Sequence, residues 1–158
     1  MTPARIKKIV RSIYVFRCGY CGITERDAGA ELTFDHFKPQ VLGGKTDVAN
    51  LIYACQACNS FKHEYYNESA QARLLHPLND DLTEHPRTDR EGTLQPLTTL
   101  GGVYIEVLHL NRAPLILSRL EDRYDQTFLE EPRKVNAVLD SLLERIASIE
   151  NRLRIRHD

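Results

Sequence analysis

The sequence has no tryptophan and a single methionine, and its cysteines number only four among 158 residues. No apolar run approaches the ~20 residues that a membrane-spanning helix needs, so we expect no transmembrane segment. The first residues include Arg5, Lys7 and Lys8 and lack the apolar core of a secretion signal, which favours a cytoplasmic location. The remaining composition, 42% hydrophobic and 27% charged, is typical of a soluble globular protein.

A strong net charge of either sign is also missing. The formal net charge is −1, which argues against a large, uniformly basic surface for nucleic acid. The charge is unevenly divided, because residues 1–66 hold nine Lys and Arg against six Asp and Glu, whereas residues 67–158 hold twelve against sixteen. The mildly basic part is the one that contains the cysteines.

The four cysteines form two pairs, each with two residues between its members: Cys18 with Cys21, and Cys55 with Cys58. Two disulfides would be the natural interpretation in a secreted mini-protein, but reducing cytosol keeps thiols free. A thiol oxidoreductase would use one such pair within a βαβ unit, and no such pattern surrounds either pair. The spacing therefore predicts a four-thiolate zinc site.

The residues around the cysteines predict short elements of both kinds, hence an α+β fold. Apolar residues at helical spacing favour an amphipathic helix over residues 4–17, whose basic face could pack on the module or contact phosphates. Residues 32–37 and 51–54 are typical of short strands. A helix is expected over residues 59–66, where Asn59 and His63 would lie one turn apart on the same face.

Residues 67–158 have a different character, and we expect an accessory region that follows a module of residues 1–66. It should contain an ordered loop over 76–91 and a short edge strand near 93–97, and Gly101 and Gly102 should break the chain before 103–110. Two helices are expected after that, one beginning at Pro114 and one at Pro132. The second carries apolar residues spaced four and three apart, which favours either an antiparallel hairpin with the first helix or pairing with a second subunit; these residues are Val135, Leu139, Leu142, Ile146, Ile149 and Leu153.

Between and after the cysteines lie polar residues that suit hydrolysis of a phosphodiester. Asp35 and Asn59 offer oxygen ligands of the kind that Mg²⁺ and Mn²⁺ prefer. His36 could accept the proton of an attacking water, Asn50 could fix the strand or the imidazole, and His63 could be a further ligand or contact a phosphate. Each residue alone has an ordinary structural explanation, such as a helix cap for Asn59 or a solvated side chain for Lys62. Their joint placement within the cysteine frame favours the chemical interpretation.

Taken in order, these motifs resemble the HNH endonuclease family, whose module has a ββα-metal fold, and within it the zinc-bearing branch with four cysteines that includes endonuclease VII-type and stand-alone bacterial HNH nucleases. The resemblance covers residues 14–66 and rests on Cys18-x2-Cys21, Asp35-His36-x2-Pro39, Gly43-Gly44, Asn50-Leu51 and Cys55-x2-Cys58-Asn59-x2-Lys62.

The resemblance implies a metal-dependent DNase with a structural Zn²⁺ and a catalytic Mg²⁺ or Mn²⁺. It implies that Asp35 and Asn59 hold the catalytic ion, that His36 activates water and that Asn50 orients His36 by holding the loop backbone. His63 stands where some members have a further ligand. Products with 5′-phosphate and 3′-hydroxyl ends, and a role in phage defence or restriction, are expected. The alternative is a zinc module that binds nucleic acid or a protein partner without cutting.

Overall fold

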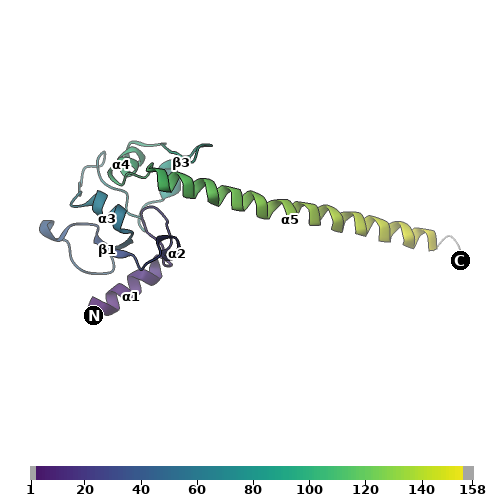
Figure 1. The fold of residues 1–158 in the computed structure, drawn as a ribbon, viewed down its shortest axis with the longest axis horizontal. Helices are drawn as coiled ribbons and strands as arrows, with labels where there is room; N and C mark the ends of the chain where they lie inside the picture. The colour runs from purple at the N-terminus through teal and green to yellow at the C-terminus, as the bar shows by residue number, and fades with distance from the viewer. Residues whose placement is uncertain (1–2, 155–158) are drawn as a thin grey trace. The chain divides into compact units, whose positions relative to one another are not determined.

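In the computed structural model, the described backbone covers residues 3–154, and the described side chains are those of residues 3–125 and 135–147. The chain forms two compact units, Met1–Ile116 and Leu117–Asp158, which we describe separately (Figure 1). The fold is α+β, with two small sheets in the first unit and one long helix that makes up the second, as the sequence predicts for its class.

The centre of the first unit is a ββα arrangement. Strand β1 (Thr33–His36) pairs antiparallel with β2 (Leu51–Ala54), so that Thr33 lies opposite Ala54 and His36 opposite Leu51. All four β2 residues are buried, which explains their continuous apolar sequence. Helix α3 (Gln56–Lys62) follows at once, capped by the side chain of Cys55. Both predicted strands are confirmed, but the helix ends at Lys62 rather than near Tyr66, because His63 has a positive φ of 47°.

Two helices precede the ββα elements. Helix α1 (Pro3–Ile13) is shorter than the predicted span of residues 4–17, because Val15 and Phe16 both adopt positive φ values and end it. The short helix α2 (Glu25–Ala28) follows α1 along the chain, and Thr24 closes a capping box at its first turn. Arg11 of α1 donates two hydrogen bonds to Glu25 of α2, at 2.6 and 2.7 Å.

The first unit continues well past Tyr66. A 3-10 helix (Leu82–Glu84), the strand pair β3 (Pro86–Thr88) and β4 (Leu94–Pro96), and helix α4 (Thr99–Val107) follow, and another 3-10 helix (Gln40–Leu42) lies earlier, between β1 and β2. Apolar side chains from this part belong to the same core as those of β2; they include Leu74, Leu75, Tyr104, Leu108 and Leu110. The compact unit thus extends to Ile116, whereas the functional boundary expected at residue 66 stays a prediction.

The position of Gly101 and Gly102 differs from the expectation. Gly101 and Gly102 lie inside α4 rather than breaking the chain. A Cβ at Gly101 would lie 2.2 Å from the carbonyl oxygen of His85, so this glycine permits a close approach between α4 and the segment before β3.

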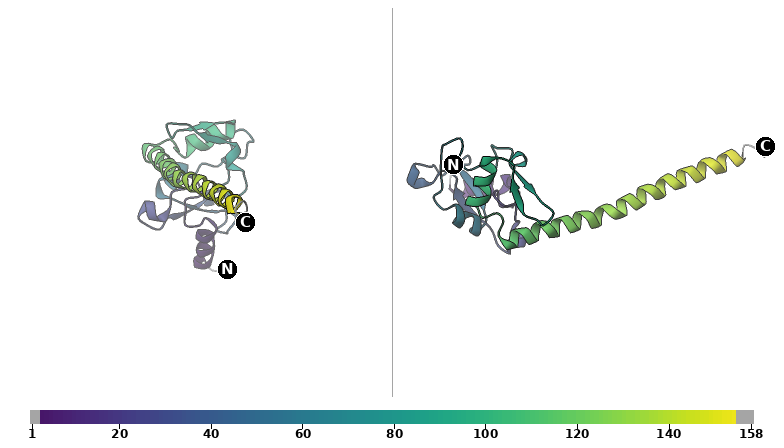
Figure 2. Two further views of the ribbon diagram at one scale, coloured as in Figure 1. Left: turned by 90° about the vertical axis from the view of Figure 1, so that its right-hand side faces the viewer. Right: turned by 90° about the horizontal axis from the view of Figure 1, so that it is seen from above.

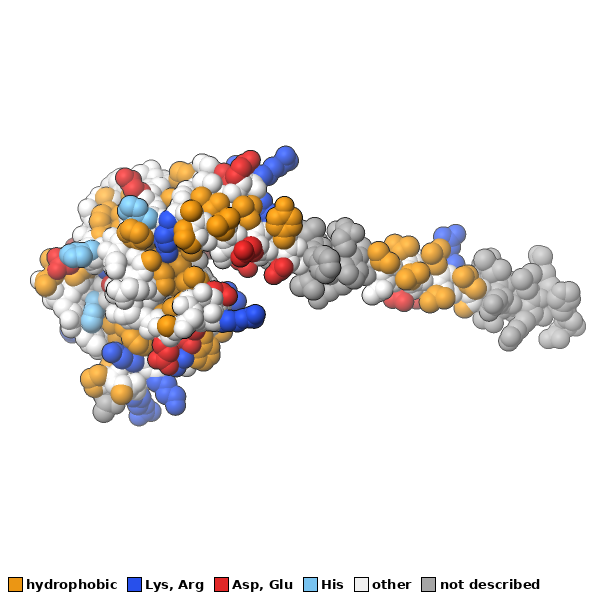
Figure 3. All heavy atoms as spheres, viewed as in Figure 1, with side chains coloured by type: hydrophobic (Ala, Val, Ile, Leu, Met, Phe, Trp, Pro, Cys, Tyr) orange, Lys and Arg blue, Asp and Glu red, His pale blue; other side chains and the backbone are white. Residues whose placement is uncertain are grey.

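The second unit corrects another expectation. Helix α5 (Ala113–Arg154) is continuous through Pro132, so the expected hairpin of two helices is wrong (Figures 1 and 2). Its residues are mostly good helix formers without a single glycine, and one proline removes only one backbone hydrogen bond. Its described side chains expose an apolar stripe (Figure 3) that includes Val135, Leu139, Leu142 and Ile146; Ile149 and Leu153 lie outside the described side chains.

Candidate metal centre and active site

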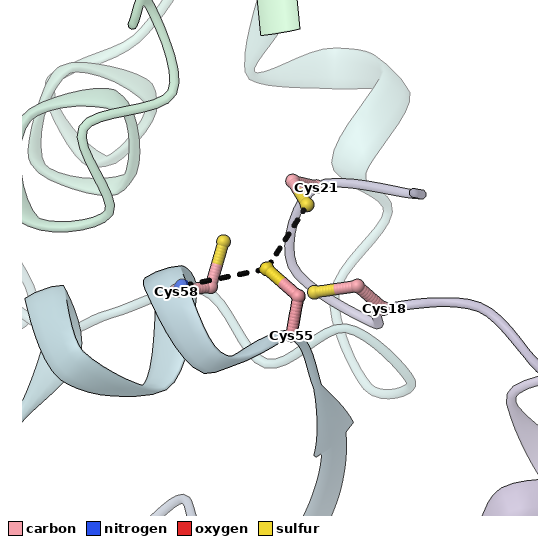
Figure 4. Close-up of side chains that lie close together, drawn as sticks. All are labelled: Cys18, Cys21, Cys55 and Cys58. Carbon is pink, nitrogen blue, oxygen red and sulfur yellow. Dashed lines mark hydrogen bonds between the residues drawn. The ribbon is translucent and has the colours of Figure 1, made fainter. Parts of the chain in front are cut away.

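The cysteines lie in two tight turns, which we call the first knuckle (residues 18–21) and the second knuckle (residues 55–58). Their four sulfur atoms converge on one point beside the start of α3 (Figure 4). Their sulfur atoms all lie within 4.8 Å of one another, and the Sγ atoms of Cys21 and Cys55 are 3.7 Å apart. A tetrahedral zinc site with Zn–S bonds of 2.3 Å places its sulfurs about 3.8 Å apart. The cysteines are therefore placed to hold a metal ion, and four sulfur ligands suit zinc.

Each knuckle is held by hydrogen bonds from its own backbone N–H groups. Gly19 of the first knuckle donates its N–H to the carbonyl of Tyr53 in β2 at 2.8 Å. A Cβ at Gly19 would lie 2.4 Å from the ring of Tyr14, so only glycine allows this approach. In the second knuckle, the Cys58 N–H donates to the sulfur of Cys55 at 3.4 Å. Hydrogen bonds from the other three thiols lower the pKa of Cys55.

A second site lies at the other end of β1. An open, polar cleft of about 300 Å³ is lined by Asp35, His36, Asn59 and His63, together with neighbours that include Pro39 and Gln40. The ββα fold thus brings three predicted metal-site residues and the predicted base to one surface. Asn50, the remaining predicted site residue, lies behind this surface and contacts the backbone of the loop that follows β1.

Asp35 is a buried residue of this cleft, only 5% exposed. Tyr20 donates its hydroxyl to Oδ2 at 2.5 Å, and the ammonium of Lys62 lies 3.2 Å from Oδ1 and 3.1 Å from Oδ2. Burial raises the pKa of Asp35, although the charge of Lys62 opposes the shift. Oδ2 has both Tyr20 and Lys62 as partners, whereas Oδ1 has only Lys62, so a lone pair of Oδ1 remains to accept a cation from the cleft.

His36 occupies the end of β1. Its Nε2 lies 2.8 Å from the hydroxyl of Thr46, and its carbonyl oxygen accepts a hydrogen bond from Lys62 at 2.9 Å. Thr46 fixes the ring at one nitrogen, and the backbone contact fixes the residue from the other side. The imidazole is therefore oriented at the edge of the cleft, as a general base requires.

Asn50 holds the loop of residues 37–45 at three points. Its side chain accepts from the Lys38 N–H at 2.8 Å and donates to the carbonyls of Lys38 at 3.0 Å and Lys45 at 2.9 Å. Its own carbonyl accepts from Phe37 N–H at 2.8 Å. Gly44 permits this closure, because a Cβ there would lie 1.7 Å from the Lys38 carbonyl oxygen. These are the loop contacts that the sequence interpretation expected of Asn50, whose catalytic role stays a prediction.

Asn59 and His63 reach the cleft from α3 and from the residue after it. Asn59 lies within the helix, while His63 is its exposed C-cap and donates its N–H to the Asn59 carbonyl at 2.9 Å. We expected Asn59 and His63 to lie one turn apart on the same face of one helix. That expectation is wrong, because the helix ends before His63. Both nevertheless line the same cleft as Asp35. The carboxylate oxygen of Asp35 and the amide oxygen of Asn59 are donors that suit Mg²⁺ or Mn²⁺, whereas the imidazole of His63 is a donor that Zn²⁺ or Fe²⁺ prefers.

Sequence reasoning missed the importance of Lys62. Its side chain is fully buried rather than solvated, and it connects Asp35 to the backbone of His36. Burial lowers the pKa of Lys62, and its contact with Asp35 opposes that shift. The signal available in the sequence was its place three residues after Asn59, within the motif that the resemblance quotes. Tyr20 and Thr46 gave no comparable signal, because their contacts depend on the fold.

A comparison with protein families accounts for this arrangement. Residues 18–64 match the family model described as HNH endonuclease. This segment contains all four cysteines, both strands and the cleft residues, and it is an HNH endonuclease domain consistent with the zinc-bearing branch. No curated protein and no solved structure matches the chain. Among the described residues, no helix is long and apolar enough to cross a membrane.

Proposed function

We propose that this protein is a metal-dependent endonuclease that hydrolyses phosphodiester bonds of DNA in the cleft between β1 and α3. The observation that carries the proposal is the joint lining of one open cleft by Asp35, His36 and Asn59 within an HNH endonuclease domain. A zinc module that only binds nucleic acid or protein has no need of these three residues at one surface.

In the proposed reaction, each residue has a separate task. Asp35 and Asn59, with His63 as a further donor, hold a divalent cation; when bound, Mg²⁺ or Mn²⁺ supplies positive charge to the phosphoryl and departing oxygens. His36 accepts the proton of the attacking water at the ring nitrogen that does not face Thr46. Asn50 keeps the loop, and with it His36, in place. The 3′ oxygen departs, which leaves 5′-phosphate and 3′-hydroxyl ends.

The four-cysteine centre has a structural task in this proposal. All four ligand positions come from the protein, and three of the four cysteines are buried. A closed site of this kind stabilises a fold, whereas a catalytic zinc keeps one position open. The Zn²⁺ would therefore hold the first knuckle against α3, and the chemistry would take place at the cleft.

The test is a nicking assay on supercoiled plasmid with the zinc-loaded full chain in EDTA, Mg²⁺ and Mn²⁺. We expect conversion to open circles with Mg²⁺ or Mn²⁺ and none with brief exposure to EDTA. DNA ligase should reseal the nicks, since it needs a 5′-phosphate and a 3′-hydroxyl. Tight DNA binding without cleavage in either metal would favour the non-catalytic zinc module instead.

A homodimer, or a protein partner, at α5 stays a prediction. The exposed apolar residues of α5 support it, because side chains spaced four and three apart form the contact seam of paired helices. The molar mass of the full chain in solution, measured by light scattering, decides between monomer and dimer.

A further inference from the structure

The four-cysteine centre has a neighbour that lies far along the sequence. Arg112, just before α5 begins, places its Nη2 3.4 Å from the sulfur of Cys58 and 3.8 Å from that of Cys55. Both of these cysteines belong to the second knuckle, so one guanidinium contacts two of the four ligands. No feature of the cysteine motif indicates a residue at this distance in the chain.

The position of Arg112 is fixed from several sides. Its Nη1 donates to the carbonyls of Leu108 at 3.0 Å and His109 at 3.2 Å. Its guanidinium carbon lies 5.5 Å from the ring centroid of Phe61 in α3, and that ring stacks on His109 with centroids 4.3 Å apart. The Arg112 side chain therefore cannot leave the sulfurs without giving up several other contacts.

The segment that carries Arg112 is itself anchored in the fold. Leu108 and Leu110 are buried in the core. Asn111 accepts from the Leu94 N–H at 2.7 Å and donates to the Leu94 carbonyl at 2.9 Å, which joins the segment to β4. The arginine is thus presented to the sulfurs by a rigid segment from outside the matched domain.

The positive charge of Arg112 lies beside sulfurs that are negatively charged when they bind a metal. A Zn²⁺ ion with four thiolates carries a net charge of −2, which is costly to keep half-buried unless a cation lies near. Hydrogen bonds between a charged donor and a charged acceptor are about twice as strong as neutral ones. Arginine suits the place better than lysine, because its planar fork can donate to the two carbonyls from one nitrogen and to the sulfurs from the other.

We propose that Arg112 is a positioning and charge-compensating residue of the zinc centre, so that residues 108–112 form part of that centre. The guanidinium stabilises the thiolate form of Cys55 and Cys58 and slows release of the metal. The ordinary alternative is a purely structural role, in which Arg112 only satisfies the carbonyls at the end of α4. The two differ in what happens to the metal.

The experiment measures the rate at which the zinc-loaded full chain releases Zn²⁺ to an excess of a chromophoric chelator. Arg112→Gln should release zinc faster by on the order of tenfold, the effect of losing one hydrogen bond to a charged group. Arg112→Lys should fall between, because it keeps the charge but loses the fork. Arg87→Gln is the matched control: it removes the same charge from an exposed position on β3 and should release zinc like the wild type.

A second readout excludes a purely structural effect. With Co²⁺ in place of Zn²⁺, the sulfur-to-cobalt charge-transfer band should move to longer wavelength in Arg112→Gln, because the sulfurs lose a stabilising cation. An unchanged band, or zinc release at the rate of Arg87→Gln, would overturn the proposal. If Arg112→Gln does not fold, Arg112→Lys decides: release faster than wild type supports the guanidinium contact, and release at the wild-type rate overturns it. Neither readout depends on DNA cleavage.

Discussion

The four-cysteine centre and the cleft are built on the same ββα elements, yet they are enclosed in opposite ways. The four sulfurs form a closed cluster with the guanidinium of Arg112 beside it. The residues that line the cleft differ in exposure, from the buried Asp35 to the exposed His63. A closed set of four protein ligands suits a metal that holds the fold, and an open set suits a metal that must meet a substrate. Within one small domain, the degree of enclosure distinguishes the proposed site of a stabilising metal from the proposed site of a reactive one.

The largest effect should come from breaking the closed site. Cys58→Ser removes a ligand that is fully buried, and structural zinc supplies much of the folding free energy of such modules. We expect loss of bound zinc, measured by elemental analysis, together with loss of the far-ultraviolet circular dichroism of the first unit. A variant that folds and retains one zinc per chain would contradict the four-thiolate assignment.

The next effect concerns the buried ion pair at the cleft. Lys62→Met leaves the Asp35 carboxylate with Tyr20 as its remaining side-chain partner. Breaking a buried pair by removing one member costs about 3–5 kcal/mol of unfolding free energy. Denaturant unfolding of the zinc-loaded chain measures it. A loss below about 1 kcal/mol would mean that Lys62 behaves as a surface residue.

The same variant predicts a pH dependence. Burial raises the pKa of Asp35, and its ionised form is the one left unpaired in Lys62→Met. The loss of unfolding free energy in Lys62→Met, relative to the wild type, should therefore grow as the pH rises above the ordinary pKa of an aspartate. It should become smaller as the pH falls toward that pKa, because the carboxyl group becomes neutral. Unfolding measured at pH 6 and pH 8, where zinc stays bound, tests the sign.

A smaller effect is expected at the loop behind the cleft. Asn50→Asp keeps the acceptor for the Lys38 N–H but loses both donors to the carbonyls of Lys38 and Lys45. The cost should be about 1–3 kcal/mol, since two hydrogen bonds worth about 0.5–1.5 kcal/mol each are lost, and zinc content should not change. Plasmid nicking should fall as well, because the loop supports His36; nicking at the wild-type rate would remove Asn50 from that role.

The smallest effect should come from Lys38→Met, which is the control for Lys62→Met. Lys38 lies 3.4 Å from Glu68, and both side chains are exposed. Exposed pairs contribute at most about 1 kcal/mol. Equal losses in the two lysine variants would break the contrast between a buried and an exposed pair.

The part of the fold that local spacing controls was predictable. The two cysteine pairs indicated the metal centre, and alternating or continuous apolar runs located both strands. Lys62 was misjudged because its burial depends on Asp35 and on the shape of the fold around it. The prediction that Gly101 and Gly102 break the chain was wrong, because Gly101 is needed for the close approach of the His85 backbone, which no local sequence pattern indicates. The contact of Arg112 with the cysteines could not be predicted for the same reason: its partners Cys55 and Cys58 are more than fifty residues away.

The most direct test of the separation between the two sites is His36→Ala, assayed for plasmid nicking and for zinc content on the same preparation. Loss of a general base lowers cleavage by about 10²–10⁴-fold. We predict that loss with one zinc per chain retained and circular dichroism unchanged. Cleavage at the wild-type rate, or a loss of zinc in parallel with activity, would contradict the account.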